Sequence, residues 1–565
     1  MAGSHYTPEV LAKFAKRTRD NHNTMYLFGI IMGGILFICM LFHLIRILGR
    51  KCLSRKQSKP SVFQLATRKI RNVAVRKAPV SFAPSIGHTA VIFLYFAANI
   101  ILTLTNLDNK NFPMLPNIAS RAGWMAIGNF VLVVLLSLKN TPLAFFSWSY
   151  ERLNILHRYA GWVTVIQVLV HLSTYCAYFV ADGRPTRLLE REEIYGMVAG
   201  CSFFFLAFSG IVIRPWWYEL FYVTHIFFWI VGITMLGLHQ PELSKNILQV
   251  VAACGGIWVL DRLLRIARLL ISSVSNEVTL YPLSNGATRV CLKKPPMGAA
   301  AGKHCFLWIP KIRQFETHPF TIASLHPMEF VIAAQDGFTA DLHRWAVTHP
   351  GITLKASVDG AYGSTPNIAN FDKTIMIGGG CGASFVFGMA LDALKRIPED
   401  RTEAILLIWI VRNAKSIAQL PWYARDVKRL QSDGRVSVKL FVTKSPSLGD
   451  SDTDSDENLF TRSAPGSSSN KKEGADIDPE KGGILSESED AGYTATHFGN
   501  APIAYGRPDV GSLIGDAIHE MNPEKHVLVL GCGPSGLMET VRSKTVSCLH
   551  GDAPSVELHC EEFGW

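Results

Sequence analysis

The stretch HRYAGWVTVIQVLVH, residues 157–171, begins and ends with histidine and is otherwise largely apolar. A second stretch of the same length, HIFFWIVGITMLGLH at residues 225–239, repeats this pattern. Fourteen steps of an α-helix, at about 100° and 1.5 Å per residue, return to within roughly 40° of the same face and climb about 21 Å. Each stretch therefore predicts a helix with two histidines on one face, close to opposite sides of a membrane.

The rest of the N-terminal half is also apolar. A membrane-spanning helix needs about 20 apolar residues, and six runs contain no Asp, Glu, Lys or Arg: 25–45, 86–107, 122–138, 159–181, 194–213 and 220–240. A seventh run begins near residue 247 and ends among the charged residues at 261–268. Only 18% of the chain is charged, where about 25% is usual. We therefore expect about seven spans, the first of which is too long for a cleaved signal peptide.

The net charge of +11 comes almost entirely from one segment. Ten Lys and Arg residues and no acid lie between residues 50 and 77, and removing these ten charges from +11 leaves +1. Cytosolic loops are the ones enriched in Lys and Arg, so this segment indicates a cytosolic arm that can touch anionic lipid headgroups. Seven crossings then put the N-terminus outside and the residues after about 268 in the cytosol. A charge localised in this way does not indicate a nucleic-acid partner.

Histidine inside a membrane span is costly and usually has a partner. Because both histidine stretches run outward, we expect His157 and His225 near the cytosolic side and His171 and His239 near the outer side. Two neutral imidazoles from facing helices are the axial ligands that a six-coordinate haem needs. The spacing therefore predicts two b-type haems, one on each side. A single intramembrane histidine is more often a hydrogen-bonded core residue, and aligned histidines can also relay protons in a transport protein.

Beyond residue 277 the pattern changes to short β-like runs broken by Pro and Gly, at 278–280, 288–292, 306–309 and 330–334. This is typical of a small antiparallel barrel. From residue 373, helical runs alternate with strand-like ones at 374–377, 404–411, 436–442 and 526–530, which indicates a parallel sheet with crossover helices. The turn IGGGCGASF at 377–385 has the glycines that let backbone N–H groups approach a pyrophosphate. Such turns also occur merely to pack a helix on a strand.

Six motifs in this order resemble those of the fungal ferric reductase family, the flavin-dependent metalloreductases related to NADPH oxidases. They are AGKH at 301–304, HPFT at 318–321, DGFT at 336–339, GGGCGASF at 378–385, WIVR at 409–412 and LGCGPSG at 530–536, followed by the closing EEFGW at 561–565. The resemblance covers roughly residues 86–565. The ending Ser384-Phe385 is closer to metalloreductases than to oxidases.

The resemblance implies cofactor sites residue by residue. FAD is expected at His318, Pro319, Phe320, Thr321, Gly337, Phe338 and Thr339, with the Thr339 hydroxyl capping a helix that runs to Val347. NADPH is expected at Gly378, Gly379, Gly380, Gly382, Ser384, Arg412, Cys532, Gly533, Pro534 and Gly536. Arg412 is expected on the 2′-phosphate, a task suited to a bidentate guanidinium. Thr321, Phe563 and Trp565 are expected to act beside the flavin, although Phe563 and Trp565 are also typical of a simple surface cap.

The predicted fold is multi-domain. We expect an N-terminal span with a basic cytosolic arm (1–84), a helical haem-binding transmembrane domain (85–270), an antiparallel β-barrel for FAD (275–370) and an α/β domain for NADPH (371–565). From about 446 to 500 the chain is rich in Ser, Asp, Glu and Gly. This composition is too polar to order itself, so we expect a disordered insertion that is either simply solvated or phosphorylated.

By resemblance, the chain is expected to be an NADPH-dependent ferric-chelate reductase that moves electrons through FAD and two haems to extracellular ferric iron. Cupric copper is a second expected substrate, and an iron-uptake transporter is the expected partner. The plasma membrane is the expected location, and a vacuolar membrane would give the same topology. Two alternatives stay open: an NADPH oxidase that makes superoxide, and a nucleotide-sensing membrane transport protein without enzyme activity.

Overall fold

The computed structural model describes residues 7–53, 69–70, 73–74, 76, 78, 85–141, 150–239, 246–283, 286–412, 421–444, 497–498, 501–549 and 554–562. The chain divides into two compact units, Met1–Ile266 and Ala267–Trp565. Most of the basic arm (50–77), nearly all of the predicted insertion (446–500) and the residues Phe563 and Trp565 lie outside the described residues. Their assignments stay predictions.

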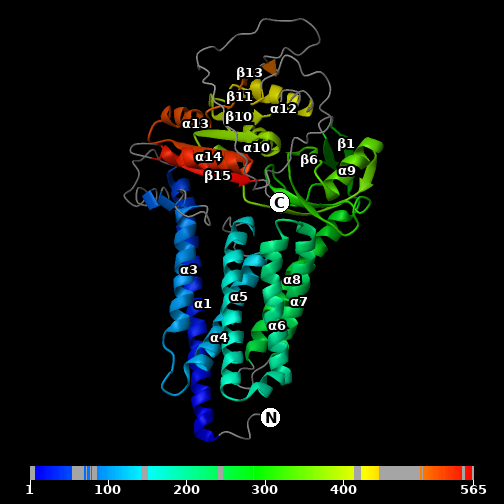
Figure 1. The fold of residues 1–565 in the computed structure, drawn as a ribbon. Helices are drawn as coiled ribbons and strands as arrows, with labels where there is room; N and C mark the ends of the chain where they lie inside the picture. Colours follow the sequence, from blue (N-terminus) through cyan, green and yellow to red (C-terminus); the bar gives the residue numbers. More distant parts are fainter. Residues whose placement is uncertain are drawn as a thin grey trace, which may run out of the picture. The chain divides into compact units, whose positions relative to one another are not determined.

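The N-terminal unit is helical (Figure 1). Its helices are α1 (Pro8–Leu53), α3 (Ile86–Leu104), α4 (Met114–Ser137), α5 (Tyr150–Ala181), the short η2 (Pro185–Leu189), α6 (Arg191–Phe208), the π-helical turn η3 (Ser209–Ile213), α7 (Tyr218–Leu238) and most of α8 (Asn246–Ser273). Among the described residues, seven helices are long and apolar enough to cross a membrane, which agrees with the predicted number. Large apolar side chains such as Ile30, Phe93 and Val223 are more than half exposed, as expected of residues that face lipid.

Helix α1 begins earlier than the apolar run in its sequence. It starts at Pro8, because neither Pro nor Gly interrupts residues 9–28. The polar first part is not simply solvated, since Asn21 and Thr24 are buried together with Phe28. The membrane unit therefore includes a polar extension of its first helix that hydropathy alone does not reveal.

Buried polar side chains connect α3, α4 and α5. The Tyr95 hydroxyl donates to Asn129 Oδ1 at 2.5 Å, and Asn129 Nδ2 donates to Asn99 Oδ1 at 2.6 Å. Gln167 Nε2 donates to Thr103 Oγ1 at 2.8 Å. Unpaired polar groups are costly away from water, so these pairs fix the relative register of the three helices.

The first part of the C-terminal unit is antiparallel. Its elements are β1 (Glu277–Pro282), β2 (Ala287–Leu292), β3 (His304–Trp308), β4 (His318–Thr321), β5 (Ser324–Leu325), β6 (Met328–Ala333), α9 (Gly337–Thr348), β7 (Thr353–Lys355) and β8 (Ser357–Tyr362). The strands form two sheets, in the orders β5-β6-β2-β1-β7 and β4-β3-β8. The closed barrel expected from the sequence is therefore not seen among the described strands.

One apolar core joins these two sheets and the helix. Val278 and Val290 of the larger sheet, Cys305 and Leu307 of the smaller sheet, and Leu342 of α9 all belong to it. Alternate residues of β3 point into this core, because successive side chains of a strand face opposite sides. The other face of the β4-β3-β8 sheet is thus left for polar and aromatic side chains.

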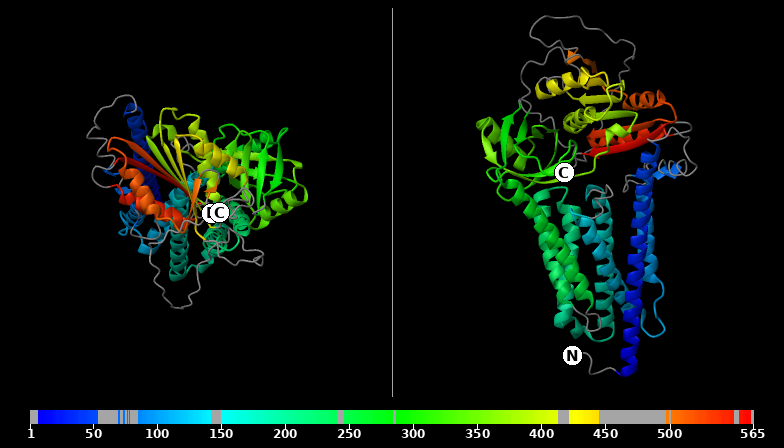
Figure 2. Two further views of the ribbon diagram at one scale, coloured as in Figure 1. Left: turned by 90° about the horizontal axis from the view of Figure 1, so that it is seen from above. Right: turned by 180° about the vertical axis from the view of Figure 1, so that it is seen from behind.

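The second part of the C-terminal unit is an α/β fold (Figure 2, yellow-green to red). Its elements are η4 (Ile368–Asn370), β9 (Lys373–Gly379), η5 (Gly380–Gly382), α10 (Ala383–Leu394), β10 (Ile405–Val411), α12 (Pro421–Gln431), β11 (Val436–Val442), β12 (His497–Phe498), β13 (Ala501–Tyr505), α13 (Val510–His519), β14 (His526–Gly533), α14 (Ser535–Ser547) and β15 (Ser555–Glu562).

The sheet order is β12-β13-β11-β10-β9-β14-β15, with parallel pairing from β13 to β15. The predicted parallel sheet with crossover helices is confirmed. The chain runs from β9 outward through β10, β11 and β13, then returns to place β14 on the other side of β9. This reversal is a topological switch point, where open α/β sheets bind ligands at the carboxyl ends of the strands.

Candidate functional site

Two motifs predicted for the flavin lie against each other. His318, at the start of β4, stacks on Phe338 of α9 with 4.6 Å between ring centroids and 20° between planes. Phe320 lies 6.1 Å from the same ring. Pro319 and Thr321 alternate with these residues along β4, where Thr321 pairs with His304 of β3. The structure therefore brings HPFT and DGFT together across a gap in the sequence.

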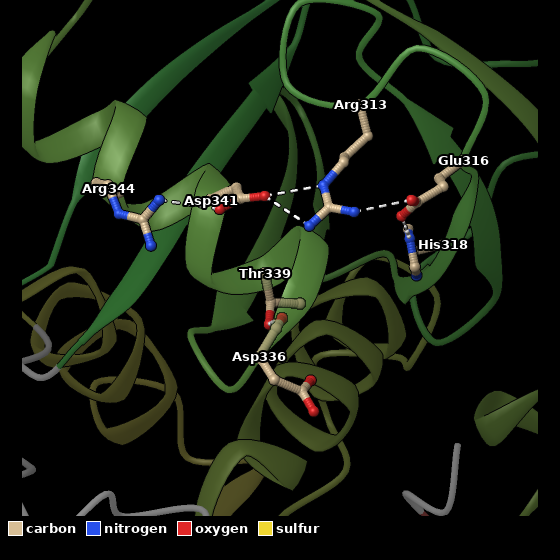
Figure 3. A network of polar contacts seen from close by, with 7 residues as sticks. All are labelled: Arg313, Glu316, His318, Asp336, Thr339, Asp341 and Arg344. Carbon is tan, nitrogen blue, oxygen red and sulfur yellow. Dashed lines mark hydrogen bonds and ion pairs between the residues drawn. The ribbon is translucent and has the colours of Figure 1, made fainter. Parts of the chain in front are cut away.

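A charged network holds the His318 side of this site (Figure 3). Arg313 donates to Asp341 Oδ2 at 2.8 Å and to Glu316 Oε1 at 2.9 Å. The other oxygen of Glu316 lies 3.1 Å from His318 Nε2, and Arg344 donates to Asp341 at 3.1 Å. The loop before β4 is thus tied to α9. The sequence analysis did not predict these four charged residues. The only signal for them was an oppositely charged pair three residues apart, Arg313 and Glu316, just before the HPFT motif.

The start of α9 differs in detail from the prediction. Asp336, not Thr339, is the N-terminal cap residue, and the helix runs from Gly337 to Thr348. The Thr339 hydroxyl donates to the Asp336 carbonyl at 2.8 Å and accepts from the Gln335 N–H at 3.0 Å. Gly337 has a φ of +47°, which only glycine adopts without strain. The turn is therefore pre-formed, and it presents the helix N-terminus, a favourable place for phosphate.

The two predicted nucleotide turns meet at the switch point. A Cβ added to Gly382 would lie 2.1 Å from the Cys532 carbonyl oxygen, and one added to Gly379 would lie 2.7 Å from Leu537. Gly378 and Gly533 are similarly crowded by neighbouring protein atoms. Gly379, Gly382 and Gly533 are explained by packing of the two turns on each other, and Gly378 by the close approach of Val386 of α10.

Gly380 and Gly536 are different. A Cβ at either position would meet nothing within 4 Å, and Gly380 has a φ of +54°. They are the open positions at which backbone could approach a ligand. Trp409 Nε1 donates to the Gly380 carbonyl at 3.1 Å, so the tryptophan of the WIVR motif fixes the turn itself.

Ser384 and Cys532 line the inner side of these turns, and both are buried. Burial is the main cause that raises the pKa of the Cys532 thiol well above its usual value, and Glu561, Cys381 and Cys560 raise it further. Burial also raises the pKa of Cys381 to about 11. Both thiols are therefore neutral at physiological pH. Pro534 precedes α14 as its N-terminal cap residue.

Arg412 follows β10 at the carboxyl edge of the sheet and is exposed. The backbone N–H of Lys444, a second basic residue, donates to the Arg412 carbonyl at 2.8 Å. Within the described part of the chain, neither residue has an ion pair with a carboxylate. This edge can therefore accept an anionic group.

The four predicted haem ligands share one feature. The Nδ1 atoms lie within hydrogen-bonding distance of backbone carbonyl oxygens: His157 with Val133 at 3.1 Å, His171 with Ala119 at 2.8 Å, His225 with Leu206 at 3.2 Å and His239 with Glu192 at 2.7 Å. A carbonyl only accepts, so each Nδ1 bears the proton and each Nε2 keeps its lone pair. A carbonyl of this kind fixes the tautomer and orientation of a metal-binding histidine.

His171 and His239, the pair predicted near the outer side, have the ring separation that one shared metal ion needs. The His171 and His239 ring centroids lie 6.3 Å apart. Two imidazoles bound to opposite sides of one ion, at about 2 Å each, would have centroids roughly 6 Å apart. Gly123 and Gly196 give these rings room, since an added Cβ would lie 2.6 Å and 2.8 Å from His171 and His239 respectively. His171 and His239 therefore fit a haem iron that both residues would hold.

The other predicted pair is His157 on α5 and His225 on α7. The π-helical turn after α6 places the Ser209 hydroxyl 3.1 Å from His225 Nδ1. Such turns are frequent at functional sites. The structure therefore brings His171 and His239 together, the pairing of His157 with His225 stays a prediction, and Phe563 and Trp565 lie outside the described residues.

Three family models match the chain in order: "Ferric reductase like transmembrane component" at residues 122–236, "FAD-binding domain" at 273–366 and "Ferric reductase NAD binding domain" at 371–546. The chain is thus a multi-pass membrane protein joined to FAD-binding and NAD-binding domains. Over these three parts it is similar to the ferric reductases of fungi.

Named relatives agree with this assignment. A probable ferric reductase transmembrane component of Candida albicans is 25% identical over 59% of this chain and 50% of its own length. A ferric/cupric reductase transmembrane component of Saccharomyces cerevisiae is 23% identical, over 79% and 61%. A probable cell surface ferric reductase of Aspergillus oryzae is 25% identical, over 64% and 52%. The chain therefore spans only about half to three fifths of these relatives.

Among solved structures, a ferredoxin reductase of carbazole 1,9a-dioxygenase is 17% identical, with a TM-score of 0.32, over 51% of this chain and 68% of that one.

Proposed function

We propose that the chain is an NADPH-dependent ferric-chelate reductase that sends electrons across the membrane. One NADPH and two ferric ions would give NADP⁺, a proton and two ferrous ions. FAD supplies the link, because it accepts the two electrons of a hydride and releases them singly to haem iron. By the names of its relatives, cupric copper is a second substrate.

The single observation that carries this proposal is the arrangement of the four histidines. His171 and His239 face each other, and all four histidines have a backbone carbonyl at Nδ1, which leaves four Nε2 atoms available to iron. A proton relay has no need for all four rings to be held in one tautomer. The arrangement therefore supports haem ligation over the transport alternative.

The residues have separable tasks in this proposal. The α9 N-terminus and the His318–Phe338 stack hold FAD, with Thr321 on the same strand. Gly380 and Gly536 let backbone approach the dinucleotide, and Arg412 recognises the 2′-phosphate of NADPH. The neutral Cys532 thiol packs at the turn without adding charge beside a transferred hydride.

The proposed orientation in the membrane rests on the basic arm. The basic arm at 50–77 orients the bundle with its C-terminal unit in the cytosol, where NADPH is available. The outer haem of His171 and His239 would then meet extracellular ferric chelate at the plasma membrane. The product would be ready for an iron-uptake transporter.

The test is NADPH-driven reduction of ferric citrate by the purified full chain, with superoxide followed in parallel. We expect ferrous iron to form at the expense of NADPH, and His171→Ala or His225→Ala to abolish it. Superoxide formation unaffected by ferric citrate, without ferrous product, would instead identify an NADPH oxidase. No NADPH oxidation with any acceptor would support the transport alternative.

A further inference from the structure

A row of side chains crosses the β4-β3-β8 sheet on the face turned away from its core. Thr321 of β4 pairs with His304 of β3, and His304 pairs with Tyr362 of β8. Directly paired residues point to the same face of a sheet. Since Cys305 and Leu307 of β3 are fully buried in the core, His304 and its partners lie on the opposite face.

Aromatic rings fill the middle of this row. The His304 and Tyr362 ring centroids are 5.9 Å apart, and Phe306 lies 5.8 Å from Tyr362 and 6.0 Å from His304. These separations are typical of favourable aromatic pairs. The row therefore extends without a break from Thr321, the residue predicted beside the flavin, to Tyr362.

The row ends on helix α8. Arg268 Nε donates to Asp359 Oδ1 at 2.8 Å, and Arg268 Nη2 donates to the Tyr362 hydroxyl. The Tyr362 hydroxyl in turn donates to Asp359 at 2.8 Å. Arg268 lies in the last turns of α8, which belong to the C-terminal unit from Ala267 onward.

Two further hydrogen bonds attach β8 to the same turns of α8. The Ser357 hydroxyl donates to the Leu269 carbonyl at 2.5 Å, and the Val358 N–H donates to the Ser272 hydroxyl at 3.4 Å. Strand β8 is therefore attached to the end of α8 along its length. The last turns of α8 thus pack as part of the same unit as the β4-β3-β8 sheet, which we call the flavin sheet.

The acidic partner of the ion pair at the end of the row is fully buried, whereas the Arg268 side chain is 36% exposed. Asp359 is 0% exposed, so its charge has lost its water and is stabilised by its hydrogen bonds, among them those from Arg268 and Tyr362. A buried ion pair contributes little net stability compared with apolar residues, and its best-attested use is to fix one register. The planar guanidinium reaches Asp359 and Tyr362 at once, which a lysine ammonium on a flexible stem does poorly.

We propose that Arg268, Asp359 and Tyr362 are positioning residues that fix the flavin sheet on the end of α8 and thereby set the rate of electron transfer from flavin to haem. This inference rests on the proposed function. Electron transfer slows steeply with the separation of its carriers. Weaker contacts between β8 and the end of α8 would therefore slow electron transfer from flavin to haem. Hydride transfer from NADPH to FAD would be spared, because the nucleotide turns belong to β9 and β14.

The experiment is stopped-flow spectroscopy of the full chain in detergent, mixed with NADPH without oxygen. Flavin bleaching and the haem Soret shift are followed separately in wild type, Asp359→Asn, Arg268→Lys and Tyr362→Phe. The matched control is Arg289→Lys, which alters another buried pair of the same domain, Arg289 with Glu329. FAD and haem contents are measured for every preparation.

We expect flavin reduction within twofold of wild type in all variants. Haem reduction should slow by about tenfold in Asp359→Asn and Arg268→Lys, and by less in Tyr362→Phe, which keeps the ring. Arg289→Lys should change neither rate. If Asp359→Asn does not fold, the rates of the milder variants Tyr362→Phe and Arg268→Lys test the inference.

The inference is overturned if the ratio of the two rates is the same in these variants as in wild type, or if both rates fall together. Failure of the proposed function would look different. In that case the wild-type protein itself would show no flavin bleaching or no haem reduction with NADPH.

Discussion

Gly123 of α4 packs tightly against the ring of His171, a predicted haem ligand. A Cβ there would lie 2.6 Å from His171 Nδ1, closer than two such atoms can approach. Overpacking of this kind costs about 1–3 kcal/mol. Gly123→Ala is therefore expected to displace the His171 ring and weaken haem binding about tenfold, measured as haem per protein and by the Soret band.

A matched control lies on the neighbouring helix. A Cβ added to Gly161 of α5 would meet nothing within 4 Å, so Gly161→Ala should leave haem content unchanged. Equal haem content in Gly123→Ala and wild type would show that the glycine is not there to make room for an iron ligand.

Arg412 tests the nucleotide preference. If its guanidinium binds the 2′-phosphate, Arg412→Ser should raise KM for NADPH by about 10- to 100-fold, because a hydrogen bond to a charged group contributes about 1.5–3 kcal/mol. KM for NADH, which lacks that phosphate, should not change. Lys428→Ser, on the exposed side of α12, is the control. A parallel rise for both nucleotides would contradict the assignment.

At the scale of residues, the predicted haem-ligating histidines could be found from the sequence, whereas the backbone groups that orient their rings could not. The equal spacing of His157/His171 and His225/His239 follows from helix periodicity, so the sequence alone placed them on one face of each helix. Their partners are backbone carbonyls of Val133, Ala119, Leu206 and Glu192. Any residue supplies a carbonyl, so no sequence pattern could point to them.

Two strands of the α/β fold are joined at their starts by Asp372. Its carboxylate accepts from the His526 N–H at 2.8 Å and from Lys525 Nζ at 3.1 Å. Burial opposes the charge, yet these hydrogen bonds prevail and lower the pKa of Asp372. A lowered pKa stabilises the fold above the unfolded value of about 3.9, and this stabilisation is lost as pH falls through the folded pKa.

Asp372→Asn removes that dependence. We expect the variant to melt at a lower temperature than wild type at pH 7, and the difference in Tm to shrink as pH falls below about 4. Circular dichroism of the full chain in detergent at several pH values measures this. A difference in Tm that is constant across the range would mean that the carboxylate charge contributes nothing.

At the scale of elements, the types of strand and helix were easier to predict than their partners. The runs that became β1, β2, β3 and β6 all follow from alternation and turn residues. Whether they close into one barrel depends on pairings between distant segments, such as β7 with β1, and on the register shift between His304 and Cys305. Neither has a local signature. The early start of α1 was missed because hydropathy does not register a polar but buried helix.

At the scale of the whole molecule, electrons are predicted to cross the membrane in one direction. Ten positive charges at residues 50–77 indicate which side of the membrane receives NADPH. In sealed vesicles, NADPH should be oxidised only when it is supplied on the side where an antibody to residues 50–77 binds, with ferric citrate on the opposite side. Activity with both substrates on one side of intact vesicles would contradict transmembrane electron transfer.

The most direct measurement of the central claim is an anaerobic absorption spectrum of the purified full chain, taken before NADPH, after NADPH and after ferric citrate. We expect a b-type Soret band that shifts to its reduced form with NADPH and returns to the oxidised form when ferric citrate is added, with two ferrous ions formed per NADPH. Absence of the Soret band, or a reduced band that ferric citrate does not reoxidise, would contradict transmembrane ferric reduction through haem.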